Sequence, residues 1–407
     1  MSLQSIIEQK DKYAQFMVDE ITHICTKLPK RGPGSEGEKL SCEYIGETMK
    51  ELGCERVEVE GFKENPGSFF GWIYITISCC FLAYAAYFFM PVLSVVFIAL
   101  GLVLCVLQFG LYKKTVDKLF KEKTGHNVHG FKKPTGEVKR RIIFNGHPDG
   151  AWEWPFKYKF KYLGFDIHMI TCFIGAFYLL AISIAKLAGA FESNPQLAKT
   201  LGLIALVFVP FWFGLYFMWN RNAIVDGAND NLSGCYIGMA ILKALKDEGI
   251  ELENTEIGVV CTGSEEAGLR GAKAWAAKHK DEMNDVPTFV YSYDTIAQSE
   301  HLMVNYRDLN STVKTDKDVG DLFMEACEEL GIPCKKGFVP PLGGATDSAA
   351  FAQEGMRSTG VTALNHALPD FYHTRLDTPE ALNPKCLADC FAASVKVLEK
   401  FDKGAKQ

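Results

Sequence analysis

The chain has 407 residues and a formal net charge of -6. A mildly acidic chain lacks the basic footprint of a nucleic-acid-binding protein, so we expect no nucleic-acid partner. The length suits one large α/β domain or two small ones. The mean hydropathy of +0.02 lies between that of soluble enzymes and that of transporters, so it reflects either a uniform mixture or two unlike parts.

Apolar residues gather in two parts of the chain. No charged residue occurs from Ser68 to Tyr112, a run long enough for two membrane-spanning helices. Charge-free runs also occupy Met169–Ala185 and Thr200–Trp219. Four buried helices of a soluble core would explain these runs, but such helices usually keep a polar face. We therefore expect four transmembrane helices in two hairpins, 68–112 and 165–219, with membrane lipid as a partner.

Lysine and arginine are distributed unequally around these hairpins. The flanks next to the rest of the chain are rich in both, whereas the hairpin tips carry only Lys186 and Lys199. The positive-inside rule then places the rest of the chain in the cytoplasm. The 13 scattered cysteines also suit a reducing compartment better than a disulfide framework. We expect an integral membrane protein with its larger part on the cytoplasmic side.

Outside the hairpins, predicted strands alternate with predicted helices. The expected helices are 36–52, 232–247, 267–279, 318–330 and 384–401, and the expected strands are 56–62, 141–145, 256–262 and 288–294. This alternation predicts an α/β fold, a three-layer αβα sandwich with a mostly parallel mixed sheet. We assign that domain to 1–67, 113–164 and 220–407. Functional sites of such folds collect at the carboxyl ends of the strands.

Five motifs lie at or just after predicted strand ends. They contain His147 with Asp149, Asp230, Glu265 with Glu266, Asp294, and His373. Each alone has an ordinary explanation, such as a turn, a helix N-cap or an acidic first helical turn. Together, two histidines and three carboxylates suit zinc better than calcium or magnesium. If one carboxylate bridges, five ligands give each of two ions three protein ligands, with room for a shared water.

At these motifs the sequence resembles the dizinc exopeptidases of metallopeptidase clan MH. It is most similar to the aminopeptidase family called peptidase family twenty-eight. The motifs GHPD, GANDNLSG, SEEAGLRGA, YSYD and YHTRLDT occur in family order, within 140–160 and 221–401. The two hairpins lie outside the resemblance, and the second is inserted between the first two motifs.

The resemblance implies a metal ligand at each of five positions. Asp230 would bridge two Zn²⁺ ions. The remaining ligands would be His147 and Asp294 for one ion, and Glu266 and His373 for the other. Other divalent metals remain compatible with the same side chains.

The resemblance also implies how the reaction is catalysed. Glu265 would be the general base that activates a water between the ions, and Asp149 would orient the metal-ligating His147. Tyr372 is a candidate oxyanion or substrate contact, and Tyr293 competes for that role. The family's serine-aspartate-histidine element carries Ser348 in place of histidine here, which puts a substrate contact in doubt.

Three further side chains near the motifs are assigned ordinary roles. Asp347 is expected to shape the pocket. Glu153 is taken as a solvated residue rather than a contact for the substrate amine. His366 is taken as structural rather than as a sixth ligand.

The resemblance implies a membrane-anchored dizinc aminopeptidase, a hydrolase acting on peptide substrates with a free N-terminus. The alternatives are a glutaminyl cyclase-like enzyme with one zinc, a carboxypeptidase-type relative, and a non-catalytic membrane scaffold. A transporter would need charged or broken positions inside the spans, and Pro210 is the main irregularity there. The sequence leaves the side-chain preference and the oligomeric state unknown.

Overall fold

A computed structural model describes residues 3–405 of the chain. Its centre is a mixed sheet of eight strands in the order β1-β2-β6-β3-β7-β12-β8-β11. The strands are β1 Arg56–Glu64, β2 Lys123–Lys132, β3 Arg140–Gly146, β6 Thr255–Thr262, β7 Thr288–Ile296, β8 Leu302–Asn305, β11 Lys335–Gly337 and β12 Arg357–Ala363. Strands β6, β3, β7 and β12 are parallel neighbours, whereas β2 runs antiparallel to β1 and β6. The predicted mixed α/β sheet is confirmed.

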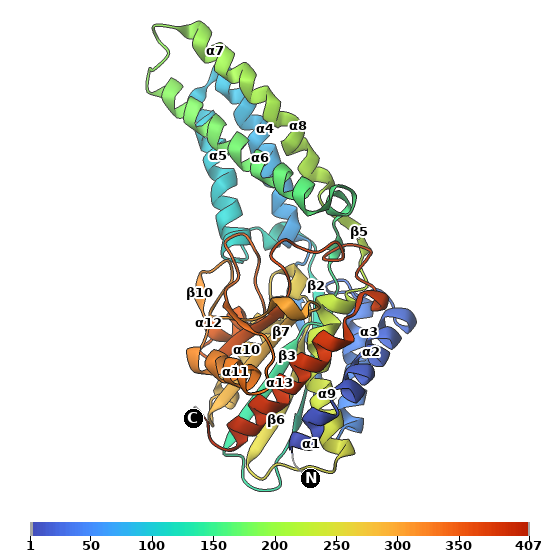
Figure 1. The fold of residues 1–407 in the computed structure, drawn as a ribbon. Coiled ribbons are helices and arrows are strands. Elements are labelled where there is room, and N and C mark those ends of the chain that lie inside the picture. The colour runs from blue at the N-terminus through green and yellow to red at the C-terminus, as the bar shows by residue number, and fades with distance from the viewer. Residues whose placement is uncertain (1–2, 406–407) are drawn as a thin grey trace.

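Helices cover both faces of this sheet (Figure 1). One face carries α1 Leu3–Glu8, α2 Lys10–Lys27, α3 Glu36–Glu51, α9 Ser233–Asp247, α11 Lys317–Glu329 and α13 Pro384–Asp402, and the other carries α10 Arg270–Met283 and α12 Ser348–Gln353. Neighbouring strand residues alternate between the two cores. Phe144 packs in the first core and Ile143 in the second. The predicted three layers are therefore present.

Four short strands form two small ribbons beside the main sheet. One ribbon pairs β4 Trp152–Glu153 with β5 Asn220–Ile224, and the other pairs β9 Arg307–Asp308 with β10 Val313–Lys314. The first ribbon joins the two ends of the second apolar hairpin, because β4 precedes that hairpin and β5 follows it.

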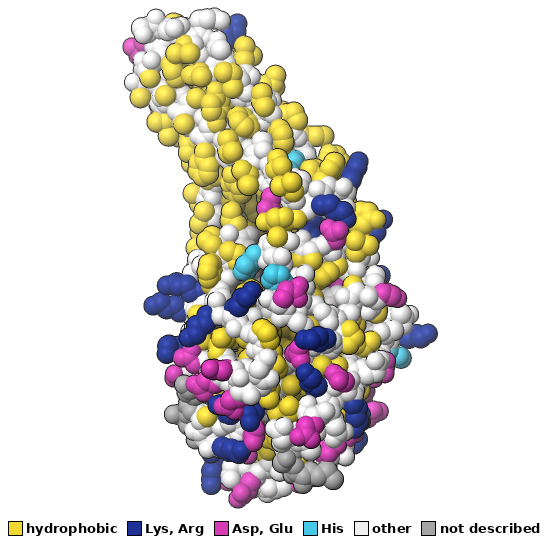
Figure 2. Space-filling model, viewed as in Figure 1, with side chains coloured by type: hydrophobic (Ala, Val, Ile, Leu, Met, Phe, Trp, Pro, Cys, Tyr) yellow, Lys and Arg dark blue, Asp and Glu magenta, His cyan; other side chains and the backbone are white. Residues whose placement is uncertain are grey.

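The apolar segments form a helical bundle that projects from one end of the sheet domain (Figure 1). Its elements are α4 Ser68–Phe89, α5 Pro91–Cys105 with η1 Val106–Gly110, α6 Pro155–Leu187, α7 Pro195–Ile204, η3 Ala205–Phe208, α8 Val209–Gly214 and η4 Leu215–Phe217. Four stretches are long and apolar enough to cross a membrane, judged by length and composition. Yellow apolar side chains dominate the visible surface of the bundle in Figure 2.

The interior of the bundle is mostly apolar, and several polar contacts join its helices. The hydroxyl of Ser94 lies 2.7 Å from that of Ser183. At the tip, the Lys186 ammonium donates to the carbonyl oxygens of Tyr87 and Phe88 near the end of α4. A cation commonly stabilises a helix C-terminus in this way. Helix α6 begins at Pro155, well ahead of residue 165, and Lys161 interrupts its regular backbone.

Both hairpins leave the domain at the same end of the sheet. Strand β1 leads directly into α4, and the segment after β3 leads through β4 into α6. Because β1 lies antiparallel to β2, which is antiparallel to β6, the ends of β1, β3 and β6 lie together. The apolar bundle therefore stands over the carboxyl ends of the parallel strands.

Candidate active site

The predicted site residues converge at the carboxyl edge of the sheet. His147 follows β3, and Asp294 lies near the end of β7. Glu265 and Glu266 begin the short helix η6 (Glu265–Ala267) after β6, and Asp230 lies in η5 (Ala228–Leu232), the turn before α9. Parallel neighbouring strands bring such chain ends together.

The loop backbone of this region is strained at two positions next to the predicted roles. Ser264, just before the two glutamates, has φ 55°, and His373 has φ 54°. Left-handed conformations of non-glycine residues are costly and concentrate at functional sites. The fold therefore holds these two loops in fixed, unfavourable conformations that present their side chains inward.

Five side chains form two overlapping groups with metal-ligand geometry. His147, Asp230 and Asp294 make one group and Asp230, Glu266 and His373 the other, each with ligand atoms within 4.8 Å of one another. Asp230 belongs to both groups. Its Oδ1 lies 3.5 Å from His147 Nε2, and its Oδ2 lies 3.0 Å from His373 Nε2. The structure thus places one carboxylate between two histidines.

Several atoms of these groups are buried without a hydrogen-bond partner. They include His147 Nε2, Asp230 Oδ2 and Glu266 Oε1. A buried polar atom without a partner is costly, and native structures rarely leave one unexplained. Imidazole nitrogen and carboxylate oxygen are ordinary zinc ligands. The residues present therefore fit a zinc site.

Burial and mutual repulsion raise the pKa values of two acids of the site, Asp294 and Glu265. Burial, aided by the Asp230 charge, raises the pKa of Asp294 to about 7. Burial also raises the pKa of Glu265 well above its usual range. Asp230 differs, because the two neighbouring histidines, His147 and His373, overcome its burial and lower its pKa. The cluster concentrates negative charge that a bound dication would offset.

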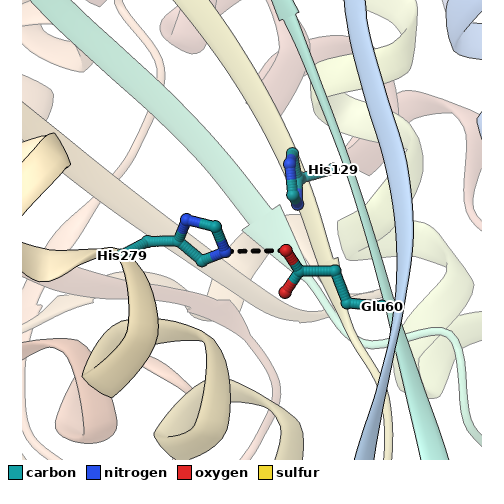
Figure 3. Close-up of side chains that lie close together, drawn as sticks. All are labelled: Glu60, His129 and His279. Carbon is teal, nitrogen blue, oxygen red and sulfur yellow. Dashed lines mark hydrogen bonds and ion pairs between the residues drawn. The ribbon is translucent and has the colours of Figure 1, made fainter.

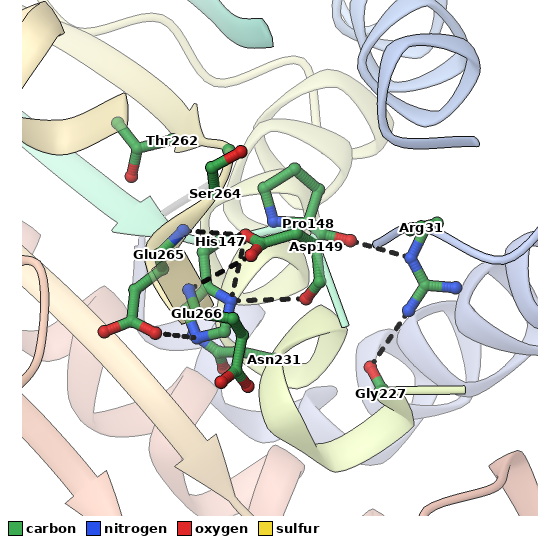
Figure 4. A network of polar contacts seen from close by, with 12 residues as sticks. Arg31, His147, Pro148, Asp149, Gly227, Asn231, Thr262, Ser264, Glu265 and Glu266 are labelled. Carbon is green, nitrogen blue, oxygen red and sulfur yellow. Dashed lines mark hydrogen bonds and ion pairs between the residues drawn. The ribbon is translucent and has the colours of Figure 1, made fainter. Parts of the chain in front are cut away.

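Asp149 connects the first histidine to the loop that carries the two glutamates (Figure 4). The backbone N–H groups of Glu265 and Glu266 each donate to an Asp149 carboxylate oxygen at 3.1 Å. Asp149 Oδ1 also lies 3.4 Å from His147 Nδ1. A partner at one ring nitrogen orients the other nitrogen of a metal-ligating histidine. Glu265 Oε2 lies 3.7 Å from His147 Nε2, at the edge of the first group.

Two residues that sequence reasoning did not assign hold the turn around Asp230. Asp377 accepts hydrogen bonds from the backbone N–H groups of Asn229 and Asp230 at 2.9 and 3.0 Å. Asn231 donates from its amide to the carbonyl of Tyr293 at 2.7 Å, which ties the turn to β7. Their position inside the quoted motifs was the available signal, but the partners lie far away in sequence.

The two candidate tyrosines lie in different surroundings. The Tyr372 ring stacks on His373 with 4.1 Å between ring centroids, and Trp154 meets the same histidine edge-on at 4.4 Å. Tyr293 is buried in the core, with its hydroxyl 2.7 Å from that of Ser394 on α13. Because neighbouring strand residues point to opposite faces, Tyr293 faces away from the site that Asp294 enters. The prediction that Tyr293 competes as an oxyanion donor is wrong.

Asp347 and Ser348 form hydrogen bonds to other residues of the domain. The Ser348 hydroxyl donates to Asp308 at 2.6 Å rather than entering the metal groups. Asp347 accepts from the Thr262 hydroxyl at 2.6 Å, while its second oxygen is buried without a partner.

Glu153 and His366 lie outside the two groups. The prediction of a solvated Glu153 is wrong, because the side chain is buried and pairs with Arg375. The residue thereby joins the strand β4 to the loop that carries His373. His366 is exposed, away from the buried ligand atoms.

A second histidine–carboxylate cluster lies on the opposite part of the sheet, between β1, β2 and α10 (Figure 3). Glu60, His129 and His279 have ligand atoms within 4.8 Å of one another. Here, however, the Glu60 carboxylate already binds His279 Nε2 at 2.8 Å and the Lys278 ammonium at 2.7 Å. The Trp275 indole N–H donates to His129 Nδ1 at 3.1 Å. Existing partners thus occupy this cluster, which indicates a structural ion-pair network.

One family model matches part of the chain. Residues 216–398 match the sequence model of Peptidase family M28. No curated protein matches the chain.

Solved structures share the fold at low sequence identity. The aminopeptidase from Aneurinibacillus sp. strain AM-1 has a TM-score of 0.58 and 14% identity, covering 98% of this chain and 96% of its own. BSAP, a zinc aminopeptidase from Bacillus subtilis, has a TM-score of 0.58 and 14% identity, with 95% of each chain covered. Porphyromonas gingivalis glutaminyl cyclase has a TM-score of 0.55 and 11% identity, covering 96% of this chain and 98% of its own. Such likeness establishes the fold alone.

Proposed function

Residues 216–398 belong to peptidase family M28, and from this premise we propose that the protein is a membrane-anchored, zinc-dependent aminopeptidase. It hydrolyses the N-terminal peptide bond of peptides with a free N-terminus. One observation carries the proposal: Asp230 lies between two histidines and belongs to both groups of metal-ligand geometry. A carboxylate shared by two ligand groups is the arrangement that a two-metal hydrolase needs.

Two zinc ions would be held by the five converging side chains. His147, Asp230 and Asp294 would hold one ion, and Asp230, Glu266 and His373 the other. When bound, such ions polarise a carbonyl and lower the pKa of water. The unpartnered atoms of His147, Asp230 and Glu266 support this assignment.

Glu265 acts as the general base in this proposal. Its carboxylate lies next to the first ligand group, 3.7 Å from His147 Nε2. It takes a proton from the attacking water and then gives it to the leaving amine. Burial raises its pKa, which brings the group closer to the pH at which one residue can both accept and donate a proton. Asp149 acts through others, by orienting His147 and holding the backbone of Glu265.

Two of the neighbouring side chains line the substrate side. Tyr372 stacks beside His373 and is the proposed oxyanion or substrate contact. Asp347 keeps one buried oxygen without a partner and shapes the pocket near Thr262.

A glutaminyl cyclase-like reaction is the second candidate function. The likeness to the Porphyromonas gingivalis cyclase covers almost the whole chain, so the fold is compatible with either chemistry. The two ligand groups favour the peptidase, because a single ion would leave part of the set unused. Metal stoichiometry therefore separates the two candidates.

The apolar bundle anchors the enzyme in the membrane in this proposal. The four long apolar helices support insertion, and the lysine-poor hairpin tips support a cytoplasmic catalytic domain. A reporter fused near Ser193 is expected outside, with both termini in the cytoplasm. A terminus found outside would reverse the orientation without affecting the chemistry.

The test uses the full chain purified in detergent. We expect about two zinc ions per chain, together with aminopeptidase activity that a chelator removes and zinc restores. Glu265→Gln should keep both ions and lower kcat by about 10²-fold or more. Full activity in this variant would exclude Glu265 as the base. One ion per chain, with cyclisation of N-terminal glutamine, would favour the cyclase instead.

A further inference from the structure

The start of α6, which leads into the second hairpin, contacts the loop that carries His373. Trp154, immediately before α6, donates its backbone N–H to the His373 carbonyl at 2.8 Å. The indole ring stacks on Phe165 of α6, with 5.1 Å between centroids. Lys157 of α6 donates to the carbonyls of Pro369 and Tyr372 at 2.6 and 3.0 Å. The start of α6 therefore forms one wall beside the candidate metal groups.

The first hairpin contacts the loop that carries the two glutamates. Gly268, two residues after Glu266, has φ +99°, and a Cβ there would lie 3.0 Å from the Phe69 ring of α4. The same Cβ would lie 3.6 Å from the Tyr112 ring at the end of this hairpin. Lys273 donates to the carbonyls of both Tyr112 and Gly268, at 2.9 and 3.2 Å. The first hairpin and the start of α6 thus both touch loops that carry candidate site residues.

Exposed apolar side chains of the sheet domain gather mainly at the same end. Outside α6 and the two hairpins, the large apolar side chains exposed within residues 3–405 are Leu119, Phe338, Leu342 and Leu376. Leu376 lies three positions after His373. Leu342 precedes Gly344, where a Cβ would lie 3.5 Å from the Tyr112 hydroxyl.

Leu119 lies at the foot of the first hairpin as well. It precedes Phe120, whose ring packs against Gly71 in α4. Exposed apolar side chains grouped on a domain otherwise covered by polar residues mark an interaction surface. Because this group continues into the apolar bundle, the surface it fits is that of the bilayer.

Exposed cations surround the same region. Lys113, Lys118 and Lys121 follow the first hairpin, and Lys159 and Arg221 flank the second. Basic residues next to spanning helices lie at the level of the lipid headgroups. The end of the domain that holds the candidate metal groups therefore lies close to the headgroup layer when the bundle is inserted.

We propose that this site takes its substrate from the membrane surface: a peptide whose apolar segment lies in the bilayer interface and whose free N-terminus reaches the metal groups past Leu342 and Leu376. The inference rests on the proposed function and names its substrate class. Partitioning concentrates such a peptide in the layer where the entrance lies, which raises its effective concentration without any new contact.

The experiment compares two peptides on the zinc-loaded full chain reconstituted in phosphatidylcholine vesicles with some phosphatidylglycerol. Both peptides share their first four residues. One continues into about 12 apolar residues, too few to span the bilayer, and the other into a polar segment of equal length. Release of the N-terminal amino acid is measured. We expect kcat/KM to be at least about tenfold higher for the apolar peptide.

Two variants then locate the entrance. Leu342→Glu and Leu376→Glu place a charge where the apolar segment passes, so each should lower the ratio of apolar to polar cleavage. Asn284→Glu is the matched control. Asn284 is exposed at the end of α10, near the amino ends of the strands, and this variant should leave both rates unchanged.

The outcomes separate this inference from the function on which it rests. Cleavage of the polar peptide at an equal or higher rate would overturn the membrane route while leaving the aminopeptidase in place. An unchanged ratio in both leucine variants would overturn the proposed entrance. If the zinc-loaded protein cleaves neither peptide, the proposed function itself fails.

Discussion

Two clusters in this protein contain the same kinds of side chain but differ in how their atoms are satisfied. The cluster around Asp230 keeps buried nitrogen and oxygen atoms without hydrogen-bond partners. In the cluster around Glu60, a carboxylate oxygen accepts from both His279 and Lys278, and an indole occupies His129 Nδ1. Residue types and distances alone place both among possible metal sites.

This difference shows that a metal site is recognised better by whether its ligand atoms lack hydrogen-bond partners than by the number of ligands. A metal at Glu60 would have to displace the Lys278 ammonium and compete with the Trp275 donor. A metal at Asp230 would instead bind atoms that have no hydrogen-bond partner, which removes a desolvation penalty. The pKa values agree, because His279 and Lys278 overcome burial and lower the pKa of Glu60 to about 2, whereas burial raises that of Asp294 to about 7.

The largest expected effect comes from removing the central ligand. Asp230→Asn should abolish high-affinity zinc binding and lower activity by more than about 100-fold, since it affects both ligand groups at once. Glu60→Gln is the matched control and should leave the zinc content and kcat unchanged. Elemental analysis and turnover of the two purified variants, with circular dichroism to check folding, measure the contrast. Loss of zinc from Glu60→Gln would break the comparison.

A smaller effect is expected at the residue that positions His147. Asp149→Asn keeps one carbonyl oxygen, so only one of the two backbone N–H groups retains its acceptor. We expect zinc affinity or activity to fall by about 10 to 100-fold, the range typical of residues that orient a ligand. A zinc titration shows whether the loss lies in metal affinity, and kcat against KM separates catalysis from binding. Unchanged zinc affinity and kcat would contradict the positioning role.

Local sequence patterns predicted the strands β1, β3, β6 and β7 and the longer helices of the C-terminal half, but not β2, β8, β11, β12 or α2. Hydrophobic runs such as 256–262 and the helical pattern at 232–247 correspond closely to β6 and α9. Strand β2 was not predicted, because several of its buried residues, such as Asn127 and His129, are polar and interrupt any hydrophobic pattern. Its place in the sheet depends on pairing with β1 and β6, which no local pattern encodes.

The candidate site was predictable in its composition but less so in its supporting contacts. The strand-end positions of His147 and Asp294 foretold their proximity, because parallel strands end at one edge. The hydrogen bond from the Asp230 backbone N–H to Asp377 joins residues far apart in sequence, so motif spacing could not predict it. The same holds for Glu153, whose burial depends on Arg375 from another loop.

A further prediction concerns how stability near the Glu60 cluster changes as the pH falls. Burial lowers the pKa of His129 to about 4, below its ordinary value near 6.5. The unfolded chain therefore binds this proton first, and stability present above pH 6.5 is lost as the pH falls toward 4. His129→Gln retains an acceptor for Trp275 but cannot titrate. Between pH 7 and 5 its apparent melting temperature should fall less than that of the native chain, by a few degrees.

The pH window separates the titration of His129 from that of Glu60. The pKa of Glu60 is about 2, so its stabilising contribution is lost only below the ordinary value near 4.5. Differential scanning fluorimetry in detergent, on the native chain and the variant at each pH, gives the comparison. Parallel melting curves over this range would show that His129 does not titrate with the low pKa that its burial implies.

The smallest effect is expected at Lys278. This variant tests whether the Lys278 ammonium alone keeps zinc away from the Glu60 carboxylate. The side chain is 58% exposed, so solvent screens its ion pair with Glu60. Lys278→Gln should therefore lower the free energy of unfolding by less than about 1 kcal/mol, because His279 still binds the same carboxylate. Lys280→Gln, which removes a similar pair with Glu354, is the matched control. Added zinc should change the unfolding midpoint of Lys278→Gln no more than it changes that of Lys280→Gln. If zinc instead raised the unfolding midpoint of Lys278→Gln alone, the Lys278 ammonium would be the only group that keeps zinc from the Glu60 cluster. The contacts of Trp275 and His279 would then not explain why this cluster differs from the one around Asp230.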